Sequence, residues 1–224
     1  MAGSTGSLYS FVEGRETLIT LFKKYLFGQL GIKNPHSHKT LIIAIQNKPT
    51  NTEHRDSIIN VDKIVAYLKS RQQELLEFAN SQRSLKYESV EIINLRLERM
   101  SFIEQLNLFN VMDVYITSQG AASYMSMFLS KPNAIMVYVP MCFASTKTCS
   151  DSNLRVHETF SNVRVISLLQ YTELLECVIG NSDEDVGYPV LPDFAYSEDF
   201  GDCNERVKPE GLFKIVSDAL SKTL

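Results

Sequence analysis

The sequence predicts an α/β fold: a Rossmann-like parallel sheet flanked by helices. Short apolar, β-branched segments alternate with longer segments in which apolar residues recur at helical spacing. This alternation is typical of parallel strands joined by right-handed crossover helices. The first strand segment, Thr40–Gln46, is a continuous apolar run, as in a strand covered on both faces of a parallel sheet. The 224 residues, with a hydrophobic fraction of 44% and a charged fraction of 21%, suffice for one large globular domain.

The first 38 residues are expected to precede this domain. Residues 1–7 are small and polar, which predicts a disordered start, and apolar residues at helical spacing predict a helix over 8–32, ended by Gly31. A polar connector with a proline follows, so we place the domain at 39–224. Because His36 and His38 lie in that connector, they are expected to be solvated rather than to bind metal.

The remaining strands and helices are predicted from the spacing of apolar residues and from the Pro and Gly residues between them. Strands are expected at Thr40–Gln46, Ser89–Leu95, Val114–Thr117, Ala134–Val139 and Val163–Ser167. Helices are expected at about Val61–Asn80, Phe102–Asn110, Ser123–Leu129, residues 168–180, and Glu210–Leu220 after Pro209. The acidic and aromatic segment 181–205 predicts a long surface loop, and His54 and His157 are also expected in loops.

Charge and hydropathy exclude some classes of function. The net charge is −4, and the Lys and Arg residues are spread along the chain, so no polybasic patch for nucleic acid or membrane is predicted. No apolar run approaches the roughly 18 residues of a membrane span, and the N-terminus lacks a signal-peptide core. No asparagine lies in an N-x-[ST] sequon.

The four cysteines show neither a CxxC pair nor zinc spacing. We expect free thiols, with a disulfide between Cys142 and Cys149 as the alternative in an oxidising compartment. The acidic run Asp183–Asp185 resembles an Asp-x-Asp metal motif, but it lies in a polar loop after a helix rather than beside a strand. We therefore expect no metal site there.

The turn Ser118–Ala122 joins a predicted strand to a predicted helix and is rich in small residues. Gly120, Ala121, Ala122 and Ser123 would let a diphosphate approach the backbone N–H groups at the helix start. The alternative is a tight turn whose small residues serve packing alone.

Basic residues follow the first predicted strand at the edge where open α/β sheets bind ligands. Lys48 and Arg55 would suit phosphates there, although solvated loop charges are the alternative. Asn60 is expected either as a helix cap or as a ligand contact.

The segment SFIEQLNLFNVMDVYITSQGAASYMSMFL (residues 101–129) resembles the family 61 glycosyltransferases. The matching positions are Phe102, Glu104, Gln105, Asp113, Val114, Gly120, Ala121, Phe128 and Leu129. TLIIAIQNK…HRDSIIN matches an earlier family element loosely, through Lys48, Arg55, Ile58 or Ile59, and Asn60. The resemblance extends over about residues 18–140 and is specific only from Phe102 onward.

The resemblance implies a two-lobed GT-B fold, of which this chain is the C-terminal, donor-binding lobe; the acceptor lobe is expected to be absent from the chain. It also implies that Glu104 and Gln105 bind a sugar or ribose hydroxyl or brace the loop. The family's His before Gly-Ala is Gln119 here. Because Gln can donate a hydrogen bond but carries no charge, the donor pose can be kept while affinity or chemistry is lost.

The sequence and the resemblance therefore support two candidate functions. The first is metal-independent transfer of a sugar from a nucleotide-sugar, by resemblance a UDP-sugar, to a glycan or protein hydroxyl, with no cofactor besides the substrate and an unassigned catalytic base. The second is a degenerate module that binds nucleotide, glycan or a partner protein. A stand-alone nucleotide-binding protein is disfavoured by the lack of GxGxxG and of a Walker lysine. The family resemblance implies the ER or Golgi lumen, whereas the missing signal peptide and sequons suit the cytoplasm.

Overall fold

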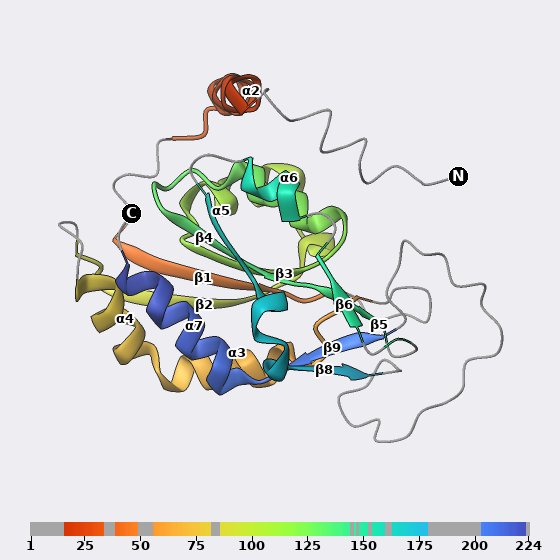
Figure 1. The fold of residues 1–224 in the computed structure, drawn as a ribbon. Helices are drawn as coiled ribbons and strands as arrows, with labels where there is room; N and C mark the ends of the chain where they lie inside the picture. The colour runs from red at the N-terminus through yellow and green to blue at the C-terminus, as the bar shows by residue number, and fades with distance from the viewer. Residues whose placement is uncertain are drawn as a thin grey trace, which may run out of the picture.

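The computed structural model describes residues 16–33, 39–48, 56–81, 86–143, 146, 148–151, 154–159, 163–178 and 203–222. Its centre is a five-stranded sheet in the order β2-β1-β3-β4-β7, with every neighbouring pair parallel (Figure 1). The strands are β1 (Thr40–Gln46), β2 (Ser89–Leu95), β3 (Val114–Ser118), β4 (Ala134–Val139) and β7 (Val163–Ser167). The predicted Rossmann-like α/β fold and its five strands are confirmed.

Helices cover both faces of the sheet (Figure 1). One face carries α3 (Val61–Ser70), α4 (Gln72–Ser81) and α7 (Pro209–Ser221). The other carries α5 (Phe102–Val111), the 3₁₀ helix η3 (Ala121–Phe128) and α6 (Leu154–Glu158), with α2 (Glu16–Gln29) outermost. A short 3₁₀ turn, η2 (Leu97–Arg99), follows β2. Of the helices that the structure describes, none has the length and apolar character to cross a membrane.

The period-2 alternation of strand side chains divides the core into two layers. On β1, Ile43 and Ile45 point to the α3, α4 and α7 side, while Ile42 and Ala44 point to the α5 and η3 side. Because all four are at most 3% exposed, both faces of β1 are fully covered, which explains the uninterrupted apolar run in its sequence.

The predicted helix over 61–80 is two helices. Arg71 leaves the helical region (φ −115°, ψ 19°), and its N–H ends α3 on the carbonyl of Leu68. Its guanidinium then pairs with Glu74 at 2.6 Å in the first turn of α4. The apolar stripe continues across this break, because Leu75 and Ala79 on α4 are buried in the same layer as α7. Apolar periodicity therefore could not reveal it.

The region after β7 departs most from the prediction. The expected helix over 168–180 is a 3₁₀ helix, η4 (Leu168–Leu174), followed by strand β8 (Leu175–Val178). β8 pairs antiparallel with β9 (Asn204–Val207), whose first two residues fall in the predicted surface loop but are buried. Antiparallel strands of four residues leave little periodicity to detect. Asp183–Asp185 lie outside the described residues.

The expectation of free thiols is wrong, because both cysteine pairs form disulfides. Cys142–Cys149 joins the hairpin strands β5 (Met141–Phe143) and β6 (Thr148–Ser150), and Cys177–Cys203 joins β8 to β9. The first pairing is the alternative that the sequence leaves open. The second spans 26 residues of sequence and depends on strand pairing that cysteine spacing does not encode.

The predicted helices at the two ends of the chain are confirmed to different extents. The helix α7 begins at Pro209 in the N1 position, as predicted. At the other end, α2 is confirmed from residue 16 onward, and the first part of the predicted helix over 8–32 lies outside the described residues.

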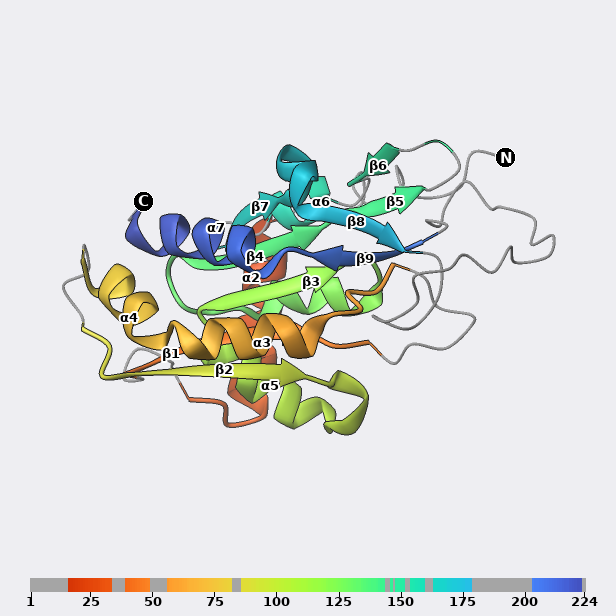
Figure 2. The ribbon, with the colours of Figure 1, turned by 90° about the horizontal axis from the view of Figure 1, so that it is seen from below.

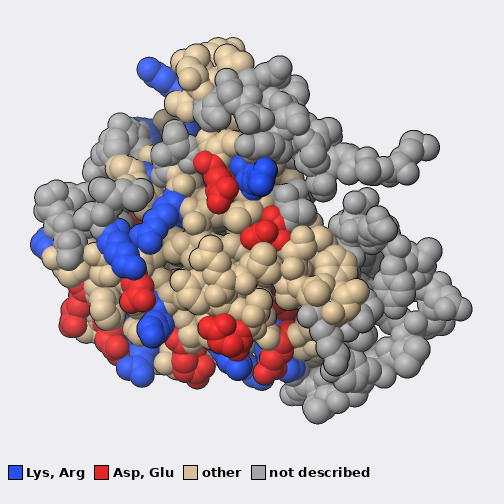
Figure 3. All heavy atoms as spheres, in the orientation of Figure 1, with Lys and Arg blue, Asp and Glu red and all other residues tan. Residues whose placement is uncertain are grey.

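On the face shown in Figure 3, acidic and basic side chains alternate over the helical layer, so no single-sign patch forms there.

Candidate functional site

The carboxyl ends of the parallel strands point to one side of the molecule (Figure 2). Lys48 follows β1 there, and Gln119 and Gly120 follow β3. Because β1 and β3 are direct neighbours, the predicted basic residue and the predicted small-residue turn meet at this edge.

Lys48 connects the two segments. Its Nζ donates to the carbonyl of Gln119 and, at 2.8 Å, to the carbonyl of Asp56. A Cβ atom placed on Gly120 would lie 3.3 Å from this Nζ, so the ammonium group lies directly against the turn. Burial lowers the pKa of Lys48, while the carboxylates of Asp56 and Glu205 act to raise it when they are ionised.

Gly120 has a backbone that favours glycine, with φ 127° and ψ −177°. It is the N-cap residue of η3, and its carbonyl accepts from the Ser123 N–H at 2.9 Å and from the Ser123 hydroxyl at 2.7 Å. The N–H groups of Ala121 and Ala122 precede this first helical bond, as the leading donors of a helix do. The expected helix at 123–129 therefore starts two residues earlier and is a 3₁₀ helix, since the Gly120 carbonyl bonds three residues ahead.

His157 lies behind this turn. It belongs to α6, not to a loop as expected, and its side chain is fully buried. Its Nε2 is 3.2 Å from the Ser123 hydroxyl and its Nδ1 is 3.1 Å from the Ser126 hydroxyl. Burial lowers the pKa of His157 to about 4, so the ring is neutral near pH 7 and has one donor and one acceptor nitrogen for the two hydroxyls. No signal in the sequence points to this residue, because its partners come from a distant helix.

Glu205 is a second residue that the sequence did not indicate. Its Oε1 accepts from the Cys142 N–H at 3.3 Å, and its Oε2 has no hydrogen-bond partner among the residues that the structure describes. Burial, helped by the negative charge of Asp56, raises the pKa of Glu205 well above its ordinary value, against the opposing effect of Lys48. Burial therefore shifts the equilibrium of this carboxyl toward its neutral form.

Strand β9 brings Glu205 to this edge. Its backbone bonds the segment after Asp56: the Glu205 N–H donates to the Ser57 carbonyl at 3.0 Å, and the Ile59 N–H donates to the Glu205 carbonyl at 3.0 Å. Asn60 completes the connection by exchanging two hydrogen bonds with the Val207 backbone, at 2.8 and 3.1 Å. The Asn60 side chain makes no cap hydrogen bond to α3, so it braces β9.

The other polar residues of the turn are buried and hydrogen-bonded. Ser118 donates to the carbonyl of Asp56 at 2.6 Å. Gln119 is 8% exposed, and its Oε1 accepts from the Tyr138 hydroxyl at 3.1 Å. Asp56, with φ 62°, is one of two non-glycine residues at positive φ in the part of the chain that the structure describes. A non-glycine residue held at positive φ marks local strain, and such strain clusters at functional sites.

Glu104 and Gln105 lie at the start of α5. Glu104 forms a capping box with Ser101, whose N–H and hydroxyl both donate to its carboxylate at 2.7 Å. Gln105 donates to the carbonyls of Leu97 and Met100 at 2.9 and 3.1 Å. The structure therefore gives both residues a bracing contact, and their predicted contact to a sugar hydroxyl stays a prediction.

Some of the residues considered in the sequence cannot be placed in the structure. Arg55 lies outside the described residues, as do His36, His38 and His54. Across the described ranges, no three His, Cys, Asp or Glu side chains gather in a way that could hold a metal ion.

A comparison with protein-family models finds a match to this chain. Residues 15–137 match the family model described as Glycosyltransferase 61, a range that includes both Lys48 and the whole turn after β3. No curated protein sequence matches the chain.

Proposed function

The chain belongs to the glycosyltransferase 61 family, and from this premise we propose that the carboxyl edge of its sheet binds a nucleotide-sugar, a UDP-sugar by family resemblance. The diphosphate would lie against the turn formed by Ser118–Ser123, next to Lys48. In a two-lobed GT-B enzyme this domain would be the donor-binding lobe. The activity would be metal-independent transfer of the sugar to a hydroxyl of a glycan or protein.

The observation that carries this proposal is the position of the Lys48 ammonium, which donates to the Gln119 carbonyl and lies where a side chain on Gly120 would meet it. It combines a cation, a glycine without a side chain and the leading N–H groups of a helix at one strand end. Each of these favours an anion, and together they make a site that suits a diphosphate.

The chain's residues would act on the leaving group. As the acceptor oxygen bonds to the anomeric carbon, the bond from that carbon to the diphosphate oxygen breaks and its electron pair stays on the diphosphate. Lys48 and the N–H groups of Ala121 and Ala122 would stabilise this growing charge. The acceptor proton passes to a general base that belongs to no residue assigned here.

Titration calorimetry with UDP, UMP and uridine tests the donor site. If the β-phosphate lies against the turn, UDP should bind at least tenfold tighter than UMP, and Lys48→Met should remove most of that difference. Lys24→Met is the matched control, because Lys24 is exposed on α2. Affinity for UDP should be the same with EDTA as with Mg²⁺. Equal binding of UDP and UMP by the wild type would contradict the proposal.

A degenerate binding module is the second candidate, favoured by Gln119 at the family's His position. The Gln119 side-chain oxygen already accepts from Tyr138, so its amide offers a neutral contact only. Release of UDP from UDP-sugars in the presence of glycan acceptors separates the candidates. UDP binding without any turnover would favour the module.

A further inference from the structure

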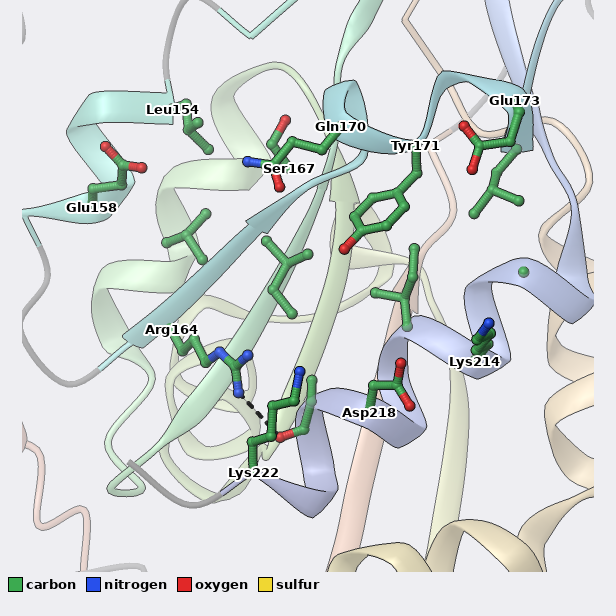
Figure 4. Close-up of a pocket in the computed structure, with 16 residues that line it drawn as sticks. Leu154, Glu158, Arg164, Ser167, Gln170, Tyr171, Glu173, Lys214, Asp218 and Lys222 are labelled. Carbon is green, nitrogen blue, oxygen red and sulfur yellow. Dashed lines mark hydrogen bonds between the residues drawn. The ribbon is translucent and has the colours of Figure 1, made fainter.

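A cavity of about 510 Å³ lies on the far side of β4 from the turn, along the edge strand β7. Figure 4 shows it bounded by β7, by η4, by α7 and by α6. Among the described strands, β7 has a partner on one side only. The four residues Arg164 to Ser167 line the cavity in succession, so it follows the unpartnered edge of the strand.

The side chains that line this cavity have no net formal charge. Three are cationic and three are anionic: Arg164, Lys214, Lys222, Glu158, Glu173 and Asp218. A phosphate or a strongly basic ligand would therefore meet as many repulsive as attractive charges. An uncharged ligand with many hydrogen-bonding groups meets no such penalty.

The lining offers hydrogen-bonding groups that the described parts of the protein leave unused. The side chains of Gln170, Lys214 and Asp218 form no hydrogen bond or ion pair with another described residue. Figure 4 shows the Tyr171 side chain extending into the cavity from η4, where its backbone (φ −138°, ψ 46°) interrupts the helix. Leu174 and Ile215 add apolar surface beside it.

We propose that this cavity is a carbohydrate subsite that holds an uncharged oligosaccharide. Sugar rings combine hydroxyl groups, which donate and accept, with apolar C–H faces. A lining of amide, carboxylate and ammonium groups around an aromatic and aliphatic floor matches both.

The location suits the acceptor of the proposed transfer reaction, on which this inference rests. Ser167, at the end of β7, pairs with Tyr138 on β4, and the Tyr138 hydroxyl donates to Gln119 in the turn. The end of the cavity at Ser167 is therefore separated from the proposed donor site by one strand, β4. An extended glycan held along β7 can direct one end toward that site.

The test is binding of uncharged tetrasaccharides of glucose, N-acetylglucosamine, xylose and mannose to the full chain, followed by NMR chemical-shift changes. We expect at least one to bind, with shifts at Gln170 and Tyr171. The double variant Gln170→Ala and Asp218→Ala should weaken that binding about tenfold. The control pair Gln29→Ala and Glu210→Ala removes the same kinds of group from exposed positions outside the cavity and should leave it unchanged.

A UDP titration of the same samples keeps the two proposals separable. UDP binding should be equal in the wild type and in the cavity variant, because the variant residues do not contact the turn. If the wild type binds a tetrasaccharide but does not bind UDP, the donor site is contradicted and the glycan subsite is still supported. If no tetrasaccharide binds, if the cavity variant binds as well as the wild type, or if only extended peptides produce shifts along β7, the carbohydrate subsite is overturned.

Discussion

The imidazole of His157 lies 3.2 Å from the hydroxyl of Ser123, and that hydroxyl in turn donates to the Gly120 carbonyl at 2.7 Å. A residue of α6 thus supports the turn after β3 from behind. Because the side chain is fully buried, its role is to position the turn rather than to meet a substrate.

His157 should make the protein less stable in acid. Its folded pKa of about 4 is below the ordinary value of 6.5, so the unfolded chain takes up the proton first as the pH falls. The stability it contributes is present above pH 6.5 and is lost toward pH 4. Between pH 6.5 and pH 5 we expect a loss of roughly 1.5 kcal/mol in the free energy of unfolding. Urea unfolding of the wild type and of His157→Gln measures it, and equal losses in both would contradict this assignment.

Glu205 should show the opposite dependence on pH. Because its folded pKa is raised, the stability it contributes is present below its unfolded pKa and is lost as the pH rises through the folded value. Glu205→Gln removes this titration and keeps an oxygen for the Cys142 N–H. We expect the variant to gain about 1 kcal/mol over the wild type at pH 8, with a smaller gain at pH 5. Glu91→Gln, at an exposed position on β2, should change little at either pH. A variant less stable than the wild type at pH 8 would refute a raised pKa for Glu205.

The sequence predicted the sheet because its three central strands, β1, β3 and β4, are largely apolar runs that both layers bury, and because the edge strands β2 and β7 keep apolar β-branched residues. It did not predict His157 or Glu205, whose partners lie in elements distant along the chain: 34 residues separate His157 from Ser123, and 63 separate Glu205 from Cys142. Local periodicity carries no information about such contacts.

The family motif also mixes two kinds of residue that a sequence cannot separate. Asp113 lies at the amino end of β3, away from the proposed site, where it pairs with Lys131 at 2.6 Å and accepts from the Ile42 N–H at 2.9 Å. Glu104 likewise caps α5. Lys48 and Gly120, by contrast, meet at the carboxyl edge. Only the fold shows which motif residues maintain the structure and which form the candidate site.

Gly120→Ala should reduce both nucleotide binding and stability. A side chain at φ 127° is strained, which costs about 1–3 kcal/mol, and the new Cβ would press on the Lys48 ammonium. We expect about tenfold weaker UDP binding, since displacing Lys48 removes a charge-assisted contact. Gly28→Ala is the control, because nothing lies within 4 Å of its added Cβ. In that helix it should raise stability by a few tenths of a kcal/mol without affecting UDP. Unchanged UDP affinity in folded Gly120→Ala would count against the phosphate turn.

Gln119→His restores the family residue, but Tyr138 limits its benefit. Burial raises the pKa of Tyr138, so its hydroxyl stays protonated and needs the acceptor that Gln119 Oε1 now supplies. A neutral imidazole can accept this hydrogen bond, whereas the imidazolium formed below pH 6.5 cannot. The single variant should therefore gain little affinity for UDP at pH 6, despite its added charge.

Combining Gln119→His with Tyr138→Phe removes this conflict and keeps the aromatic ring beside His157. The free imidazolium can then donate to the diphosphate, and a charge-assisted bond in place of a neutral one is worth roughly 1 kcal/mol, or about fivefold in affinity. We expect the double variant to bind UDP about fivefold tighter at pH 6 than at pH 8, after correction for the same comparison in Tyr138→Phe alone. Calorimetry at both pH values measures this difference. If the double variant shows no dependence on pH beyond that control, the introduced imidazole does not meet a phosphate, and the turn after β3 is not the donor site.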